Sequence, residues 1–331
     1  MNAPDRFALP VPDEDLARLE ACLRRVVVQG DAFLDEVATH LVDAGGKRLR
    51  PALSLVAASL GGEETTEDTL LGAVSVELVH LASLYHDDVM DEATKRRNVA
   101  SVNARWGNLV AIVAGDFLLA RSAEIAASLG TEVAGLLAAT LARLCQGQIA
   151  EVRAAYDVGR AEEGYLTAVA DKTAALMSAA CRIGALTAGL ERTDVEALTR
   201  YGECLGIVFQ IRDDVLDVVA DETELGKPPG QDLAEGIYTL PVQRALTDLR
   251  VGAELRAVLG RPLDRDEVEV ARGLVARSTG IAASAAVARR YAEEAVEAAR
   301  GLGDGEVPTS LAELALGLLD DLEQSTRALA S

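Results

Sequence analysis

Apolar residues recur at three- and four-residue spacing along nearly the whole chain, and this pattern most limits the folds open to it. Such spacing places apolar side chains on one face of an α-helix. No stretch alternates between apolar and polar residues for long enough to build a sheet. The chain has 331 residues, 50% of them hydrophobic and only 3% aromatic. We therefore predict an all-α fold with a sizeable core.

Helix breaks are expected where glycine, proline and acidic residues cluster. Such clusters lie at residues 61–64, 159–164, 221–241, 260–266 and 301–308. Capping-box patterns predict helix starts at Thr193 and Ser310.

Two segments, residues 133–144 and 174–190, are apolar on nearly every side. Helices of that kind are buried, so we expect a layered helical bundle around a central cavity rather than one ring of amphipathic helices. We expect a single domain over residues 1–331, with residues 1–15 as an N-terminal tail.

The formal net charge of −21 argues against a nucleic-acid partner, because a phosphate backbone needs a basic surface. The longest apolar run, residues 174–190, contains Arg182, so no membrane span is expected. Residues 1–12 lack the apolar core of a signal peptide. We expect a cytoplasmic protein that catches an anionic substrate through local basic residues and metal ions.

One acidic pattern occurs twice, and its members are Asp87, Asp88 and Asp91 in the first copy and Asp213, Asp214 and Asp217 in the second. In a helix, positions i and i+4 share a face, so each copy gathers carboxylates that repel by roughly 3 kcal/mol per pair. Mg²⁺ relieves such repulsion and binds one or two carboxylates together with substrate phosphates. A single copy could be a solvated acidic helix end, but two copies favour facing walls of one cavity.

Basic residues accompany both acidic motifs. Three cations in four residues, Lys47, Arg48 and Arg50, stand out in so acidic a chain and suit phosphate binding. The other candidates are Arg96 and Arg97 after the first motif, Lys227 after the second, and the pair Lys172 and Thr173. His80 shares a helix face with Asp87 and is expected either to donate a hydrogen bond to a diphosphate or to lie in the core.

Together these residues resemble the trans-polyprenyl diphosphate synthase family. A GGKRxRP motif, a DDxxD motif with two arginines after it, a Lys-Thr pair, an FQxxDDxxD motif and a GKxxGxDL loop follow in that order between Gly45 and Pro241. One DDxxD motif is a weak signal, whereas the ordered set is specific. The resemblance implies the all-α isoprenoid synthase type I fold, Mg²⁺ dependence with three ions per site, and a homodimer.

The resemblance also implies roles for single residues. The six aspartates hold the metal ions that grip an allylic diphosphate. The implied contacts of that diphosphate are Arg96, Lys172 and Lys227, those of isopentenyl diphosphate are Lys47, Arg50, His80 and Arg97, and the residues near the reacting carbons are Thr173 and Gln210. Metal ions and cations would neutralise the departing diphosphate, while an apolar cavity protects the allylic cation. The released diphosphate is the expected proton acceptor.

The chain departs from the family pattern at two places. Ile237 stands where lysine is common, so one diphosphate contact is missing or replaced. Asn98 follows Arg97 where glycine and proline are common, which leaves the shape of that loop open.

Product length is expected to depend on the helix before Asp87. Ala82 and Ser83 lie about 6 to 7.5 Å before it along the axis, and both are small. Val79 and Val76 follow further along the helix, so no aromatic side chain closes a tunnel there. The family resemblance, closest to actinobacterial long-chain members, then implies a product of C30 or longer for menaquinone side chains and transient membrane association during its release.

Alternatives stay open at this stage. The floor of the tunnel could lie on another helix, which would give a C20 geranylgeranyl product. A class I terpene cyclase usually has a single aspartate-rich motif and lacks the basic pocket. A non-catalytic partner subunit usually has eroded motifs.

Overall fold

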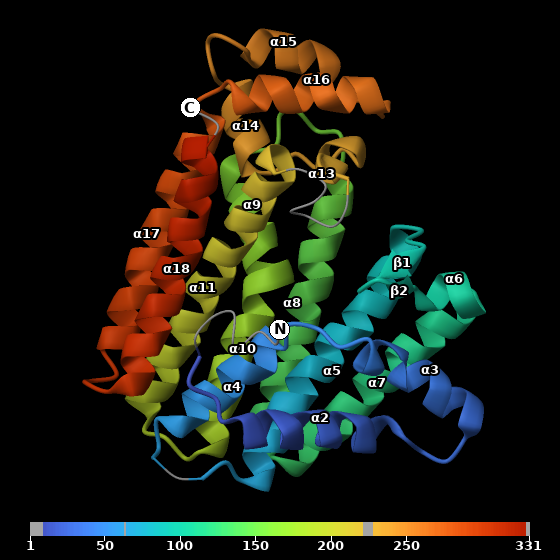
Figure 1. The fold of residues 1–331 in the computed structure, drawn as a ribbon, viewed down its shortest axis with the longest axis vertical. Coiled ribbons are helices and arrows are strands. Elements are labelled where there is room, and N and C mark those ends of the chain that lie inside the picture. Colours follow the sequence, from blue (N-terminus) through green and yellow to red (C-terminus); the bar gives the residue numbers. More distant parts are fainter. Residues whose placement is uncertain (1–8, 63, 221–227, 329–331) are drawn as a thin grey trace. The chain divides into compact units, whose positions relative to one another are not determined.

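The computed structural model describes residues 9–62, 64–220 and 228–328, and the all-α prediction is confirmed (Figure 1). The helices of the first half are α2 (Asp13–Val27), α3 (Ala32–Asp43), α4 (Leu49–Ser59), α5 (Glu67–Met90), α6 (Val102–Trp106), α7 (Asn108–Ser128) and α8 (Thr131–Arg153). The later ones are α9 (Glu162–Val169), α10 (Ala175–Thr187), α11 (Arg192–Val219), α13 (Gln231–Ala234), α14 (Leu240–Leu246), α15 (Gly252–Val258), α16 (Arg265–Ala276), α17 (Gly280–Arg300) and α18 (Glu306–Ala328). A π-helical turn, η1 (Ala170–Ala174), joins α9 to α10, and β1 (Lys95–Arg96) pairs with β2 (Val99–Ala100).

Helices end next to the predicted breaks: α4 before residues 61–64, α8 before 159–164, α15 before 260–266 and α17 before 301–308. The two predicted helix starts are wrong. Helix α11 already begins at Arg192 and α18 at Glu306, so Thr193 and Ser310 lie inside helices. A capping box is present at the start of α16, where Asp264 and Glu267 bond reciprocally.

The described chain forms two compact units. Unit 1 lies within Met1–Leu141, Leu176–Thr199 and Gly301–Leu311, and unit 2 within Ala142–Ala175, Arg200–Arg300 and Ala312–Ser331. Each unit therefore combines segments that are far apart in sequence. One domain over residues 1–331 stays a prediction, and the predicted tail, residues 1–15, overlaps the first turn of α2.

Unit 1 is organised around α5, which contacts α2, α4 and α7 (Figure 1). One face of α5 joins an apolar cluster with α2, α3 and α7, to which it contributes Leu70, Leu78, Leu81 and Tyr85. The Tyr85 hydroxyl donates to the Val37 carbonyl at 2.7 Å, which satisfies its only polar atom inside that cluster. Helix α10 reaches α4 through Gly184, where a Cβ atom would lie 2.0 Å from the Ser54 carbonyl oxygen.

Unit 2 contains α9, η1 and most of α11, together with helices α13 to α17. Helices α14 and α17 pack closely, and Gly280 at the start of α17 leaves no room for a Cβ against the Pro241 carbonyl. An ion pair between Arg289 and Glu323 ties α17 to α18, which run side by side in Figure 1.

Burial of the two all-round apolar segments is confirmed for most of one and wrong for the other. In the segment 174–190, residues 174–181 and 183–185 are buried, whereas Arg182 and residues 186–190 are not. Helix α8, which contains residues 133–144, is long and apolar enough to cross a membrane by length and composition, but only 22% of its most apolar window is buried. An apolar pattern shows that a helix face will be covered, but it does not show whether the same chain covers it.

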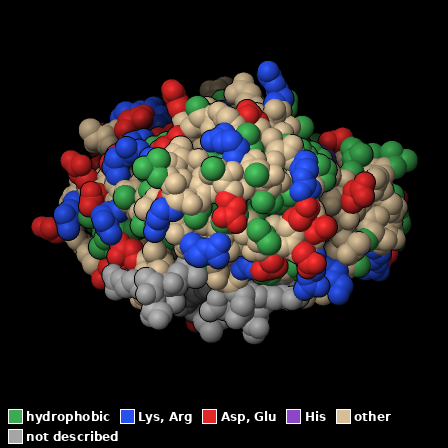
Figure 2. Space-filling model, turned by 90° about the horizontal axis from the view of Figure 1, so that it is seen from above, with side chains coloured by type: hydrophobic (Ala, Val, Ile, Leu, Met, Phe, Trp, Pro, Cys, Tyr) green, Lys and Arg blue, Asp and Glu red, His purple; other side chains and the backbone are tan. Residues whose placement is uncertain are grey.

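Acidic and basic side chains are interspersed on the face drawn in Figure 2. Acidic residues outnumber lysines and arginines by 53 to 32 over the whole chain, yet on this face they do not form one separate patch. Mixed charge of this kind is typical of a solvated protein surface and does not resemble the basic stripe of a nucleic-acid-binding protein.

Candidate active site

The first aspartate motif lies at the C-terminal end of α5. Asp87 is half-buried, Asp88 is fully buried and Asp91, the C-cap residue, is exposed. Arg96 contacts Asp88 Oδ1 through Nε at 2.7 Å and through a terminal nitrogen at 2.6 Å. Burial raises the pKa of Asp88, and the Arg96 guanidinium opposes that rise. The other oxygen, Oδ2, is buried with no hydrogen-bond partner among the described residues, so it could still accept a donor or a cation.

The loop after this motif is a tight hairpin. Lys95 pairs with Ala100 and Arg96 with Val99, which leaves Arg97 and Asn98 as the two turn residues. Both have positive φ, 51° and 65°, the pattern of a type I′ turn. Asn98 tolerates that conformation well, so the departure from glycine and proline is accommodated. The hairpin directs Arg96 towards Asp88 and Arg97 towards the basic loop.

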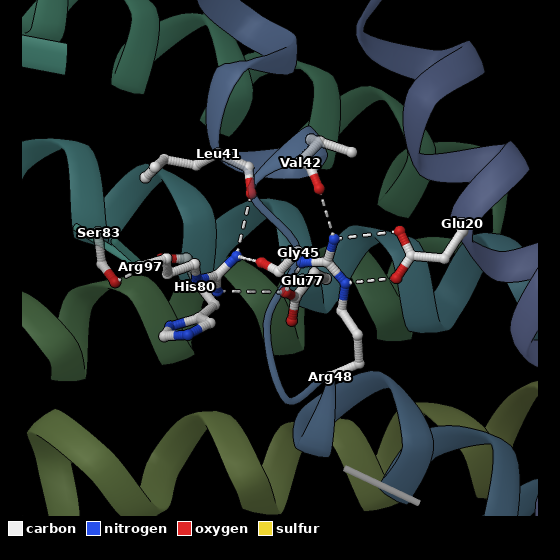
Figure 3. Close-up of polar contacts among 9 residues, drawn as sticks. All are labelled: Glu20, Leu41, Val42, Gly45, Arg48, Glu77, His80, Ser83 and Arg97. Atoms are coloured by element: carbon white, nitrogen blue, oxygen red, sulfur yellow. Dashed lines mark hydrogen bonds and ion pairs between the residues drawn. The ribbon is translucent and has the colours of Figure 1, made fainter. Parts of the chain in front are cut away.

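The basic loop comprises residues 44–48, between α3 and α4. Arg97 donates to the carbonyls of Leu41 and Gly45, and its side chain is mostly buried (Figure 3). At Gly46, which has φ 149°, a Cβ atom would lie 2.6 Å from the Arg97 Cζ, so this close approach requires glycine. Lys47 is exposed and Arg50, in the first turn of α4, is half-buried.

His80 lies on α5 among these cations and is half-buried. Desolvation lowers its pKa well below the usual value, and the positive charges of Arg50, Arg97, Arg48 and Arg96 lower it further. His80 is therefore neutral at physiological pH, with one ring N–H to donate. Its carbonyl accepts from the Ser83 hydroxyl at 2.8 Å (Figure 3).

The second aspartate motif ends α11, and its middle carboxylate is held by protein donors. Tyr165 Oη donates to Asp214 Oδ2 at 2.5 Å, and Gln210 Nε2 donates to Oδ1 at 2.7 Å. Thr173 Oγ1 in turn donates to Gln210 Oε1 at 2.7 Å. Burial raises the pKa of Asp214 to about 7, although both hydrogen bonds oppose the rise. The predicted residues Thr173, Gln210 and Asp214 thus form one chain of hydrogen bonds within unit 2.

The other two carboxylates of this motif differ in exposure. Asp213 is half-buried and contacts Arg212 at 3.1 Å. Asp217 is buried, and the backbone N–H of Asp232 donates to its Oδ2 at 3.3 Å. Lys227 lies outside the described residues. Ile237, at the position where lysine was expected, is half-buried, and its N–H donates to the Asp232 carbonyl at 2.7 Å.

The Lys172–Thr173 pair lies in η1, the π-helical turn. Such turns interrupt the regular i to i+4 pattern and are frequent at functional sites. Two glycines make room for it: a Cβ at Gly147 would lie 2.7 Å from the Lys172 nitrogen, and one at Gly206 would lie 2.5 Å from the Ala174 Cα. Lys172 forms an ion pair with Glu151.

The four residues expected to set product length occupy two faces of α5. Ala82 is fully buried in the apolar cluster with α2, α3 and α7. Ser83 is half-buried, while Val79 and Val76 are buried outside that cluster. Gly72 lies on this second side, where a Cβ would be 2.7 Å from Ile183 on α10. Ser83 therefore has more room than Ala82 to accept a larger side chain.

The sequence did not single out four residues that make polar contacts with the motif residues. Glu20 and Glu77 accept hydrogen bonds from Arg48, Glu151 pairs with Lys172, and Tyr165 donates to Asp214. The sequence did contain a signal for Glu77, because it is a charged residue within an apolar helical segment. Such a residue is seldom fully buried without a partner, so a nearby cation could have been expected. The others occupy ordinary helical positions, and only the tertiary contacts distinguish them.

The carboxylates fit a hard divalent ion in type. No three His, Cys, Asp or Glu side chains within the described ranges converge closely enough to hold a metal by themselves. Magnesium commonly binds through one or two carboxylates, with phosphate oxygens and water completing its shell. That mode suits Asp87 and Asp213, which are both half-buried. The predicted opposition of the two motifs across a cavity stays a prediction.

Comparisons with known proteins agree with the motifs. A sequence profile described as polyprenyl synthetase matches residues 31–275. The chain is 42% identical to a nonaprenyl diphosphate synthase of Mycobacterium tuberculosis, over 85% of this chain and 84% of that protein. It is 41% identical to component 2 of a heptaprenyl diphosphate synthase of Geobacillus stearothermophilus, over 92% and 94%. A crystal structure of a polyprenyl synthase from Caulobacter crescentus, complexed with calcium and isoprenyl diphosphate, aligns with a TM-score of 0.88 at 32% identity, over 95% of this chain and 97% of that one.

Proposed function

The chain belongs to the polyprenyl synthetase family, and on that premise we propose that it extends farnesyl or geranylgeranyl diphosphate with isopentenyl diphosphate to an all-trans product of C30 or longer. It is a trans-prenyltransferase. The observation that supports a long product is the small side chains on α5 ahead of Asp87, where Ser83 is only half-buried. Similarity to nonaprenyl and heptaprenyl diphosphate synthases supports the same length class.

The family uses a divalent metal ion, and we propose Mg²⁺, with three ions bound when both substrates are present. Asp87 and Asp91 of the first motif and Asp213 and Asp217 of the second would hold the ions. Asp88 and Asp214 would support these ligands from positions fixed by Arg96 and Tyr165. When bound, the ions supply positive charge that stabilises the departing diphosphate.

The protein's own residues would bind and orient the two substrates. Arg96, Lys172 and Lys227 are assigned to the allylic diphosphate; Lys47, Arg50, His80 and Arg97 are assigned to isopentenyl diphosphate. Neutral His80 suits a hydrogen-bond donor beside several cations, because it adds no further positive charge. Thr173 and Gln210 would lie near the reacting carbons, in positions that their mutual hydrogen bond fixes.

Product mass after incubation with Mg²⁺, farnesyl or geranylgeranyl diphosphate and isopentenyl diphosphate tests this proposal. We expect products of C30 or longer, and none when a chelator removes the metal. If C20 were the sole product, the protein would be a geranylgeranyl diphosphate synthase and the long-chain proposal would be wrong. Cyclic hydrocarbons would point to a terpene cyclase. If no condensation were detected, the result would favour the alternative of a non-catalytic partner subunit.

The apolar side of α8 that is exposed in this chain is expected to be buried against another molecule, and we propose that a second copy of the chain packs against it. A bilayer is a poor cover, because Arg143 lies at the middle of α8, where a charge is costly in lipid, and it pairs with Asp171. Helix α7 presents a further apolar face with Leu109, Ile112 and Val113, which are 76%, 43% and 55% exposed. Since one relative is component 2 of its enzyme, a different partner chain is the competing outcome.

The proposed product is almost entirely hydrocarbon and cannot leave freely into water. We propose that the enzyme works in the cytoplasm and touches a membrane only while the product is released, and that the product becomes a menaquinone side chain. Loss of the long-chain quinone from cells that lack this gene would support that destination; an unchanged quinone pool would contradict it.

A further inference from the structure

Glu77 is a charged residue in the middle of an apolar helix. Its side chain is 2% exposed, and it lies on α5 between two guanidinium groups. Arg48 donates to Glu77 Oε1 at 2.8 Å, and a terminal nitrogen of Arg97 lies 3.9 Å from the same oxygen (Figure 3). A carboxylate buried this deeply persists only where cations compensate its charge. Glu77 therefore links two basic segments that are far apart in sequence.

All three guanidinium nitrogens of Arg48 donate hydrogen bonds to protein groups, so Arg48 is not placed to bind a diphosphate. Its Nε and a terminal nitrogen donate to the two oxygens of Glu20 at 2.7 and 3.1 Å. The same terminal nitrogen also donates to the Val42 carbonyl at 2.9 Å. The Arg48 side chain is 3% exposed. Although its sequence position is between Lys47 and Arg50, its guanidinium points into the protein (Figure 3).

The backbone at Arg48 also needs support. Arg48 is the N-cap residue of α4 and has φ 48° and ψ 30°, a left-handed conformation that is uncommon for a residue with a Cβ. Fixed contacts in the surrounding structure hold such a residue in place. On the other side of the loop, Arg97 bonds to the Gly45 carbonyl and lies against Gly46. The loop is thus held from both ends by guanidinium groups that share Glu77.

We propose that Arg48, Glu20 and Glu77 are positioning residues for the isopentenyl diphosphate site. They fix the backbone of the basic loop and the first turn of α4, from which Lys47 and Arg50 extend. Two glutamates balance the charges of Arg48 and Arg97, so Arg48 acts on the substrate only through the position of its neighbours. This inference rests on the proposed function, because it assumes that Lys47 and Arg50 bind isopentenyl diphosphate.

The mildest test is Glu20→Gln. Glu20 is 47% exposed, and in this variant the buried Arg48 keeps its contacts with Glu77 and the Val42 carbonyl, so the protein is expected to fold normally. We expect the KM for isopentenyl diphosphate to rise about 3- to 10-fold, with the KM for the allylic substrate and kcat nearly unchanged, because small displacements of a binding group weaken its contacts. Glu36→Gln is the matched control, since Glu36 is 52% exposed and pairs with Arg105 away from the loop.

A stronger test compares Arg48→Lys with Arg48→Met. Lysine keeps the charge but cannot contact Glu20, Glu77 and Val42 together. We expect the KM for isopentenyl diphosphate to rise about tenfold in Arg48→Lys and about 100-fold in Arg48→Met. Amide hydrogen exchange at residues 44–50 should rise in the same order, which gives a readout apart from activity.

The outcomes separate this inference from the proposed function. Wild-type protein without prenyl transfer would overturn the function itself. Active wild type, with an unchanged KM for isopentenyl diphosphate and unchanged exchange at residues 44–50 in Glu20→Gln, would overturn the positioning role. If Arg48→Met fails to fold, Glu20→Gln and Arg48→Lys still decide the question. An equal rise in both KM values would also contradict it, since a general loss of structure has no preference for one substrate.

Discussion

Tyr165 and Asp214 form a hydrogen bond of 2.5 Å between two buried side chains, one from α9 and one from α11. A buried charge needs such donors, because desolvation is only partly compensated by distant cations. The contact connects a residue outside every family motif to the centre of the second aspartate motif.

Tyr165→Phe removes one of the two donors of Asp214. We expect the free energy of unfolding to fall by about 1 to 3 kcal/mol and turnover to fall about tenfold or more, because a buried carboxylate loses a partner and its orientation. Chemical denaturation and initial rates measure both. Tyr291→Phe is the control, since Tyr291 is half-buried and contacts Arg290 through its ring. Equal effects in both variants would refute a specific role for the Tyr165 hydroxyl.

Stability should depend on pH through Asp214. Its folded-state pKa is raised from 3.8 to about 7, so between these values the folded protein holds a proton that the unfolded chain has lost. The free energy of unfolding therefore decreases as pH rises through this window. Between pH 5 and pH 8, without added metal, wild type should lose on the order of 3 kcal/mol more than Asp214→Asn.

His80 titrates in the opposite sense, because its lowered pKa makes the folded state bind fewer protons. It is present in both proteins, so its contribution cancels in the comparison of wild type with Asp214→Asn. Parallel pH profiles for the two proteins would show that Asp214 is ionised throughout, contrary to expectation.

The aspartates of the first motif should separate into two kinds. Asp87→Asn should reduce turnover by orders of magnitude and raise the Mg²⁺ concentration required, with little change in melting temperature, because Asp87 is half-buried. Asp88→Asn should also lower stability by about 3 kcal/mol, because Arg96 loses its buried partner. Alanine at Asp88 or Asp214 should likewise cut turnover by orders of magnitude. Metal titrations and thermal unfolding of the same preparations distinguish these cases; wild-type rates would refute the assignment.

Product length should respond to side-chain size on α5 one turn before Asp87. Ser83→Phe should shorten the product while the first condensation continues. The phenylalanine adds bulk about one turn before Asp87, at a position that is only half-buried. Ala82→Phe should also shorten it, but at about 1 to 3 kcal/mol of stability, because Ala82 is fully buried. Leu84→Phe is the control for Ser83→Phe, because Leu84 packs against the apolar cluster with α2, α3 and α7, to which Ser83 does not belong. Unchanged product mass in both test variants would place the tunnel elsewhere.

Self-association should depend on the apolar face of α7. Leu109→Glu combined with Val113→Glu places two charges one helical turn apart on exposed positions, so the monomer should fold and the dimer should dissociate. Light scattering after size exclusion gives the mass. Leu316→Glu on α18, where the leucine is 42% exposed, is the control. A monomeric wild type, active only with another chain, would favour the two-component alternative.

The helices, most of their breaks and the two aspartate motifs could be predicted from the sequence alone. Apolar spacing predicted helices because the period of the pattern is the period of the helix, and charge spacing identified both aspartate motifs for the same reason. Clusters of glycine, proline and acidic residues located the breaks near α4, α8, α15 and α17 because such residues disfavour a continued helix. The start of α18 was missed, because Ser310 has the pattern of a cap while the helix already begins at Glu306.

Tertiary structure decided which charged side chain faces which. Arg48 belongs by sequence to a phosphate-binding motif, yet its guanidinium is buried against Glu20 and Glu77, because α2 and α5 bring their carboxylates to it. Helix α8 has the pattern of a core helix but is mostly exposed, since nothing in a periodic pattern specifies what will cover the apolar side. Burial depends on contacts between segments distant in sequence, and those contacts exist only once the helices have packed.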